Sequence, residues 1–244
     1  MKLALIKTAI WTLSHLIVQK DTFIDAANLY TNKQYAQSIS LCNTVLPRLN
    51  VKDTLYEKYI LLRGSAYFEM HDFDSSIKDY LILIGLKPKE IPYRINLAYM
   101  YGEIKRFDDC LTTLNNALEI DTTNTVTLSN LSYYSGQFFK YSDAVRYAEK
   151  GLKYPADSAV KSALLNNKGY GYIGLKRYSE ALNNINLAIK FDPNNSFAYC
   201  FRALAHIRLK QMETVCDDLN KAKELGGVAL TEELRKKYCT LQKI

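Results

Sequence analysis

The sequence contains few of the residues and motifs that carry enzymatic chemistry. Its three histidines, His15, His71 and His206, lie far apart along the chain. It has no glycine-rich phosphate loop and no nucleophile elbow, and the spacings of its five cysteines fit no zinc motif. We therefore expect a protein that is not an enzyme and that needs no metal and no cofactor.

The chain also lacks a linker rich in proline, glycine and serine, which predicts a single domain. Its net charge of +7 comes from 32 basic and 25 acidic side chains, and the basic ones are scattered, many at turns and helix ends. Helix C-termini favour cations, so this distribution indicates a solvated surface rather than a nucleic-acid site. A preference for acidic partners stays open as an alternative.

What the chain does contain is an internal repeat. Six positions, which we call the anchors, recur at intervals of 38, 34, 34, 37 and 34 residues. The anchors are Tyr35, Phe73, Phe107, Tyr141, Tyr178 and Met212. Around each anchor lie two apolar-periodic stretches of about a dozen residues, which is the pattern of amphipathic helices. A period of this kind predicts a stack of similar helix pairs.

Small residues predominate at two further positions of the period. Nine residues before the anchors are Ala26, Gly64, Ala98, Ser132, Gly169 and Ala203. Three residues after the anchors are Ser38, Ser76, Cys110, Ala144, Ala181 and Val215. Because small residues let helix backbones approach closely, we expect the helices of each pair to meet at these positions, with the anchor ring at their junction.

This pattern resembles the tetratricopeptide repeat. The fifth unit carries the family motif most completely, with Gly169, Tyr172, Tyr178, Ala181, Ala188 and Pro193. The resemblance covers roughly residues 20–228 and implies an all-α, right-handed superhelical solenoid of about six helix pairs. Residues 229–244 are then expected to form a C-terminal capping helix.

In the resembled family, the first helix of each pair lines the concave face. The matching positions imply a peptide-binding groove lined by Leu61, Phe68, Ile95, Tyr99, Tyr133, Asn166, Tyr170 and Ile173. Tyrosine suits recognition because it is a rigid apolar ring with a hydroxyl group. Asn166 could bond a peptide backbone, and Gly136 would let a ligand approach the helix. The alternative is that these tyrosines only pack between neighbouring first helices.

We therefore expect an interaction scaffold that binds a peptide or helix of an unidentified partner protein in the concave groove. The Lys and Asn clamp with which one family subtype grips chaperone tails is not reproduced, since Phe23 and Ala27 stand at its first-repeat positions. The alternative function is a structural subunit that stacks into a larger cell-envelope complex. Monomer and homodimer both stay open.

The N-terminal residues 1–19 combine a charged start with an apolar segment of the length typical of a signal peptide. Lys7 and His15 within that segment, and the lack of an Ala-x-Ala cleavage site, argue against export. The alternative is an N-terminal amphipathic helix of a cytoplasmic protein. In either case we expect no membrane span.

The C-terminal run contains Cys216-Asp217-Asp218, then Leu225-Gly226-Gly227 and then Tyr238-Cys239. This run resembles the ending of exported repeat proteins of some Gram-negative bacteria, which implies a periplasmic protein. Antiparallel helices folding about Gly226-Gly227 would place Cys216 opposite Cys239. This predicts a disulfide if the protein is exported, the alternative being two buried thiols. The other three cysteines, Cys42, Cys110 and Cys200, are expected to be free.

Overall fold

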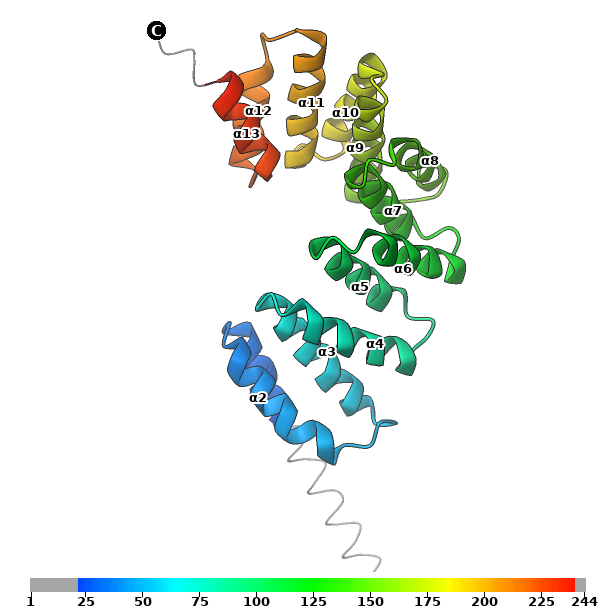
Figure 1. The fold of residues 1–244 in the computed structure, drawn as a ribbon, viewed down its shortest axis with the longest axis vertical. Coiled ribbons are helices and arrows are strands. Elements are labelled where there is room, and N and C mark those ends of the chain that lie inside the picture. The colour runs from blue at the N-terminus through cyan, green and yellow to red at the C-terminus, as the bar shows by residue number, and fades with distance from the viewer. Residues whose placement is uncertain (1–21, 240–244) are drawn as a thin grey trace, which may run out of the picture. The chain divides into compact units, whose positions relative to one another are not determined.

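The computed structural model describes residues 22–239, and all regular secondary structure in that range is helical (Figure 1). This confirms the predicted all-α fold. The proposed signal segment, residues 1–19, lies outside the described residues. Within residues 22–239, every helix is too short or too polar to cross a bilayer.

The helices alternate as first and second members of pairs. The first helices are residues 22–31, α3 (Thr54–Glu69), α5 (Ile91–Glu103), α7 (Thr125–Gln137), α9 (Ser158–Gly174) and α11 (Ser196–Leu209). The second helices are α2 (Tyr35–Val45), α4 (Phe73–Leu86), α6 (Phe107–Ile120), α8 (Tyr141–Gly151), α10 (Tyr178–Phe191) and α12 (Val215–Glu224). The short helix η1 (Leu46–Arg48) follows α2, and α13 (Ala229–Tyr238) follows α12.

The anchors mark the beginnings of the second helices. Five of the six anchors are the first residue of their helix, from Tyr35 in α2 to Tyr178 in α10. The sixth pair differs, because α12 begins at Val215 and leaves Met212 exposed in the preceding turn. Met212, the anchor without an aromatic ring, thus lies in the turn between the two helices and not at the first residue of the second helix.

The turn inside each pair has the same backbone conformation in all six repeats. The residue two before each anchor has φ close to +60°, although none of the six is glycine. These residues are Lys33, His71, Lys105, Phe139, Lys176 and Lys210. The next residue donates its N–H to the carbonyl five residues earlier, as from Gln34 to Leu29 at 2.8 Å and from Gln211 to His206 at 2.9 Å. This left-handed closure satisfies a carbonyl at each helix end.

The small residues lie where the two helices of a pair approach each other. The Ser38 hydroxyl donates to the carbonyl of Ala26 at 2.8 Å, and the Ser132 hydroxyl donates to the carbonyl of Ala144 at 2.7 Å. A Cβ added at Gly169 would lie 2.5 Å from a side-chain atom of α10. These contacts confirm the close approach that the spacing predicts.

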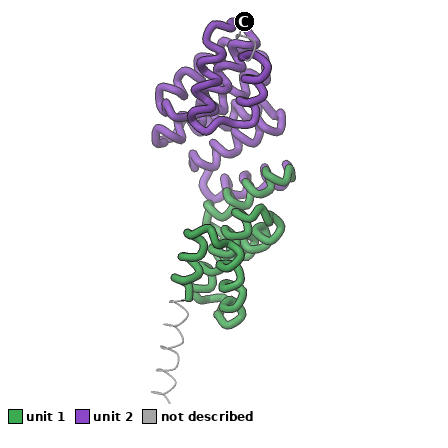
Figure 2. The backbone as a smooth tube through the Cα atoms, turned by 90° about the vertical axis from the view of Figure 1, so that its left-hand side faces the viewer, with its two compact units in different colours: residues 1–106 green, residues 107–244 purple. Residues whose placement is uncertain are grey.

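The chain divides into two compact units between Arg106 and Phe107 (Figure 2). Unit 1 contains the described helices through α5, and unit 2 contains α6 to α13. In unit 2, one apolar core runs from α9 through α13 and includes Leu165, Phe201, Leu219 and Leu234. Unit 1 therefore contains the first helices 22–31, α3 and α5, and unit 2 contains the first helices α7, α9 and α11.

Candidate functional site

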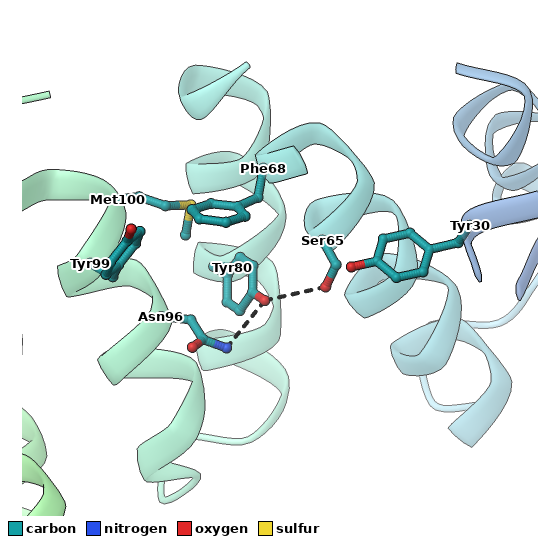
Figure 3. A pocket seen from close by; sticks show the side chains of 7 residues that line it. All are labelled: Tyr30, Ser65, Phe68, Tyr80, Asn96, Tyr99 and Met100. Carbon is teal, nitrogen blue, oxygen red and sulfur yellow. Dashed lines mark hydrogen bonds between the residues drawn. The ribbon is translucent and has the colours of Figure 1, made fainter. Parts of the chain in front are cut away.

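Unit 1 has a pocket of about 190 Å³ among its first helices, shown in Figure 3. The unit 1 pocket is lined by Tyr30, Ser65, Phe68, Tyr80, Asn96, Tyr99 and Met100. Phe68 and Tyr99, both predicted groove residues, meet edge to face with ring centroids 5.4 Å apart. Tyr99 keeps 44% of its surface exposed. A large aromatic surface is thus open to a ligand on this face.

Polar side chains form a short hydrogen-bonded chain across the unit 1 pocket. The Asn96 amide donates to the Tyr80 hydroxyl at 3.2 Å, and the Ser65 hydroxyl lies 3.4 Å from the same oxygen (Figure 3). Burial, together with the Glu103 carboxylate, raises the pKa of Tyr99 above its ordinary value. A hydrogen bond to Glu103 contributes to this shift, so the Tyr99 hydroxyl is engaged within unit 1 while its ring stays exposed.

Unit 2 has a second pocket, of about 210 Å³, formed by α7, α9 and the beginning of α11. This amide pocket is lined by Ser129, Asn130, Tyr133, Ala163, Asn166, Asn167, Asn195 and Phe197. Asn166 is 3% exposed, and no donor within residues 22–239 reaches its Oδ1. A buried carbonyl left unpaired costs about 1–3 kcal/mol, so an N–H group that reached it would relieve that penalty.

The NH₂ groups of two neighbouring amides are engaged in hydrogen bonds within unit 2. Asn167 donates to the carbonyl of Ser129 at 3.1 Å, and Asn195 donates to the hydroxyl of Ser162 at 3.0 Å. These bonds fix the two side chains that flank the amide pocket. The pocket therefore combines a rigid polar wall with one buried acceptor that has no partner.

A row of aromatic rings leads from the amide pocket along α9. Successive centroids are 6.2 Å apart for Tyr133 and Phe197, 6.1 Å for Phe197 and Phe201, and 4.4 Å for Phe201 and Tyr170. Tyr141 then meets Tyr170 at 6.1 Å. Two rings of α11, Phe197 and Phe201, thus connect Tyr133 of α7 with Tyr170 of α9.

The Tyr170 ring also covers Gly136. A Cβ added at Gly136 would lie 2.9 Å from the Tyr170 ring. The expectation that Gly136 leaves room for a ligand is therefore wrong, because the side chain of the next first helix occupies that room. Burial is the main cause that raises the pKa of Tyr170. Tyr170 is a packing residue on one side and borders a groove on the other.

That groove lies between the C-terminal ends of α9 and α11 and the length of α13, and it has a volume of about 500 Å³. We call it the C-terminal groove. Tyr170 and Ile173, two predicted groove residues, both line it, and Ile173 is otherwise buried. The tyrosine row therefore connects the amide pocket at one end with this groove at the other.

Six of the eight predicted groove residues line one of these three pockets. Phe68 and Tyr99 line the unit 1 pocket. Tyr133 and Asn166 line the amide pocket, and Tyr170 and Ile173 line the third pocket, the C-terminal groove. Leu61 and Ile95 are half-buried and line none of the three pockets.

Three pocket asparagines were missed by the sequence analysis. Asn96, Asn130 and Asn167 each stand eleven residues before an anchor, in three successive repeats. Two of them line the amide pocket, and Asn96 lines the unit 1 pocket. Their shared position in the period was a signal that could have identified them.

The structure joins Cys216 to Cys239 by a disulfide, with Cα atoms 5.6 Å apart. The pair lies on the hairpin of α12 and α13, whose turn residues Gly226 and Gly227 have φ of +103° and +52°. The hairpin geometry expected from the sequence therefore brings these cysteines together. The other cysteines, Cys42, Cys110 and Cys200, are buried free thiols.

Comparison with known proteins agrees with this fold. Residues 162–195 match the family model of the tetratricopeptide repeat. Human tetratricopeptide repeat protein 34 is 31% identical over 93 residues, which are 38% of this chain and 16% of the relative. Stress-induced-phosphoprotein 1 of Caenorhabditis elegans is 25% identical over 185 residues, 64% of this chain and 58% of the relative. The chain thus matches less than two thirds of either relative.

Solved structures show the same likeness in three dimensions. A tetratricopeptide repeat protein from Parabacteroides merdae superposes with a TM-score of 0.75 at 15% identity, covering 90% of this chain and 85% of that one. PilW, a type IV pilus biogenesis factor, gives a TM-score of 0.63 at 16% identity, covering 74% and 84%. The chain therefore has the fold of a tetratricopeptide-repeat protein.

Proposed function

We propose that this protein is a non-enzymatic interaction scaffold and that the first helices of unit 2 bind an extended segment of a partner protein. The observation that carries the proposal is the unpaired Oδ1 of Asn166, buried in a pocket lined by amides and by the Tyr133 ring. An extended peptide has free backbone N–H groups and projecting side chains, so it can supply both a donor and apolar surface.

The aromatic row supports the same proposal. Tyrosine and phenylalanine give large contact areas at small entropic cost, and such rings dominate many protein interfaces. The half-buried rings of Tyr133, Phe197 and Tyr170 offer apolar surface to a bound segment on unit 2, and the buried Phe201 supports two of them from below. The unit 1 pocket, with exposed Tyr99, offers a second contact surface of the same chemical kind.

The test is peptide selection on the purified full chain with a phage-displayed library of short random peptides. Selected peptides are then synthesised and titrated against wild type and Asn166→Leu. The leucine is close in size and removes the acceptor, so we expect binding to weaken about tenfold while the fold is retained. Phe191→Ala is the control outside the three pockets, because Phe191 is 40% exposed on the second helix α10 and lines none of them, so its loss should leave peptide binding unchanged.

Two results would contradict the proposal. One is equal binding of the selected peptides by wild type and Asn166→Leu, and the other is a failure of the full chain to select any peptide. Light scattering over a range of concentrations tests the alternative, a self-assembling structural subunit. A mass that grows with concentration while no peptide binds would favour that alternative.

A further inference from the structure

The C-terminal groove has an apolar floor made from the C-terminal ends of α9 and α11 and from one side of α13. The floor residues come from α9, α11 and α13, and they are Tyr170, Ile173, Leu204, Ile207, Leu230 and Tyr238. A groove of about 500 Å³ can receive one or two large apolar side chains. The floor therefore favours a ligand with aliphatic or aromatic groups.

The rim of this groove is positively charged. Lys176, Arg208 and Lys237 line it together with a single carboxylate, Glu233, and all four side chains belong to exposed residues. None of the four makes an ion pair with another residue of the described range 22–239. The neighbouring Arg177, by contrast, pairs with a carboxylate. The rim cations are thus available to a ligand.

The ends of the helices themselves reduce this charge without cancelling it. Each cation lies near the C-terminal end of a helix, where the partial charge is about −0.5. Three cations and one carboxylate give a side-chain charge of +2, and three helix ends offset about 1.5 of it. Because that partial charge falls off within the last turn, the exposed side-chain tips project a positive field toward solvent.

We propose that the C-terminal groove binds an acidic segment of a partner protein, with an apolar side chain on the floor and carboxylates at Lys176, Arg208 and Lys237. The proposal rests on the proposed function, because it adds the chemistry of the ligand to a scaffold that binds peptides. Tyr133 of the amide pocket and Tyr170 of this groove lie on the first helices α7 and α9 of the same unit. Arg208 can hold a carboxylate through two parallel N–H bonds, and the lysines act as point charges.

The experiment starts from peptides that the oxidised full chain selects from a phage-displayed random library. We expect enrichment of Asp and Glu beside Leu or Phe. The most enriched peptide is synthesised with a fluorescent label, together with a version in which Asn and Gln replace Asp and Glu. Titration at low ionic strength should show the amide version binding about tenfold more weakly, and added salt should weaken the acidic version.

The matching protein variants are R208E/K237E and a control, K150E/K153E. The control changes the same number of charges at the C-terminal end of α8, away from the groove residues. We expect R208E/K237E to bind the acidic peptide at least about tenfold more weakly, and the control to stay within about twofold of wild type. If R208E/K237E loses its helical circular dichroism, R208Q/K237Q replaces it with the same expected direction.

Three outcomes would overturn this inference. Selected peptides without acidic enrichment would leave the scaffold function standing and remove the acidic ligand. Equal binding of the acidic peptide by wild type and the charge variants would do the same. Competition by single-stranded RNA at equal charge concentration would mean that the rim holds any polyanion. A chain that selects no peptide would instead end both proposals.

Discussion

The guanidinium of Arg63 on α3 holds the carboxylate of Asp79 on α4 through two parallel hydrogen bonds, with Nη2–Oδ1 at 2.6 Å and Nε–Oδ2 at 2.9 Å. Arg202 and Asp218 repeat this arrangement in unit 2, with the same separation of 16 residues. In both repeats the arginine stands ten residues before the anchor and the aspartate six after it. The pair is thus a feature of the repeat itself, linking its two helices.

The buried pair predicts a large loss of stability when one partner is removed. Asp79 is almost fully buried, with a side chain 3% exposed, so Asp79→Ala leaves the guanidinium without its partner and should lower the free energy of unfolding by about 3 kcal/mol. Asp143→Ala removes a pair that is exposed on both sides and should cost about 0.5 kcal/mol or less. Urea unfolding compares the two variants, and equal losses would contradict the prediction.

The left-handed turns predict a stabilising substitution. Phe139 has φ of +61° and is 74% exposed, so its side chain adds backbone strain and little packing. Phe139→Gly relieves that strain and should raise the free energy of unfolding by up to about 1 kcal/mol. The control is Lys140→Gly, because Lys140 has φ of −85° and gains nothing from glycine. A thermal unfolding curve with Phe139→Gly below wild type would refute this account of the turn.

The cysteines predict a characteristic thiol count. Burial raises the pKa of the Cys42 and Cys110 thiols to about 12 and also raises the pKa of Cys200, so no thiolate is available at neutral pH. We expect Ellman's reagent to find no reactive thiol in the native protein and three after denaturation without reductant. Reduction before denaturation should give all five. Five thiols in the unreduced, denatured chain would mean that Cys216 and Cys239 are not bonded.

Reduction of the disulfide should loosen α13. The bond closes a loop between residues 23 positions apart, which on the chain-entropy model is worth about 3 kcal/mol. Because α13 supplies Leu230 and Lys237 to the C-terminal groove, Cys239→Ser should also weaken binding there. Amide hydrogen exchange should become faster in residues 229–238 and stay unchanged in α4. Uniform acceleration in both helices would show that the bond stabilises the chain globally instead.

The lowered pKa of Glu57 predicts that unit 1 loses part of its stability in acid. Burial alone would raise its pKa, but hydrogen bonds from the Lys87 ammonium at 2.8 Å and the Tyr93 hydroxyl at 2.5 Å outweigh burial, and the pKa is lowered. Stabilisation by a carboxyl with a lowered pKa is present above its unfolded pKa of about 4.3 and is lost as the pH falls through the folded pKa. The stability advantage of wild type over Glu57→Gln should therefore shrink on acidification.

Urea midpoints at neutral pH and at successively lower pH measure that difference. Glu119→Gln, a change at an exposed residue on α6, serves as the control and should keep a constant offset from wild type. If the stability difference between wild type and Glu57→Gln instead grows as the pH falls, the lowered pKa of Glu57 does not stabilise the folded state.

The helix pairs could be predicted because their signals are local and repeated. The anchor spacing identified the starts of five second helices, and the small residues around Ser38 and Ser132 identified where the helices touch. The left-handed turn residues could not be predicted in this way. Lysine, histidine and phenylalanine stand where glycine would normally indicate a positive φ.

Only part of the candidate site could be predicted from the sequence. Tyr99 and Tyr170 occupy the same position of the repeat, yet Tyr99 is well exposed, whereas Tyr170 stacks on Phe201 and covers Gly136. Likewise, Asn166 becomes a buried acceptor only because α7, α9 and α11 close around it. Such differences depend on side chains from other helices.

Residue order alone thus specified repeated amphipathic helices, their pairing and the hairpin that brings Cys216 to Cys239, since each follows from spacing along one or two neighbouring helices. Packing between repeats decided which aromatic rings are exposed, which buried carbonyl lacks a donor and which cations line the C-terminal groove. The reason is that exposure and electrostatic field are sums over neighbours distant in sequence, and no single position in the period encodes them.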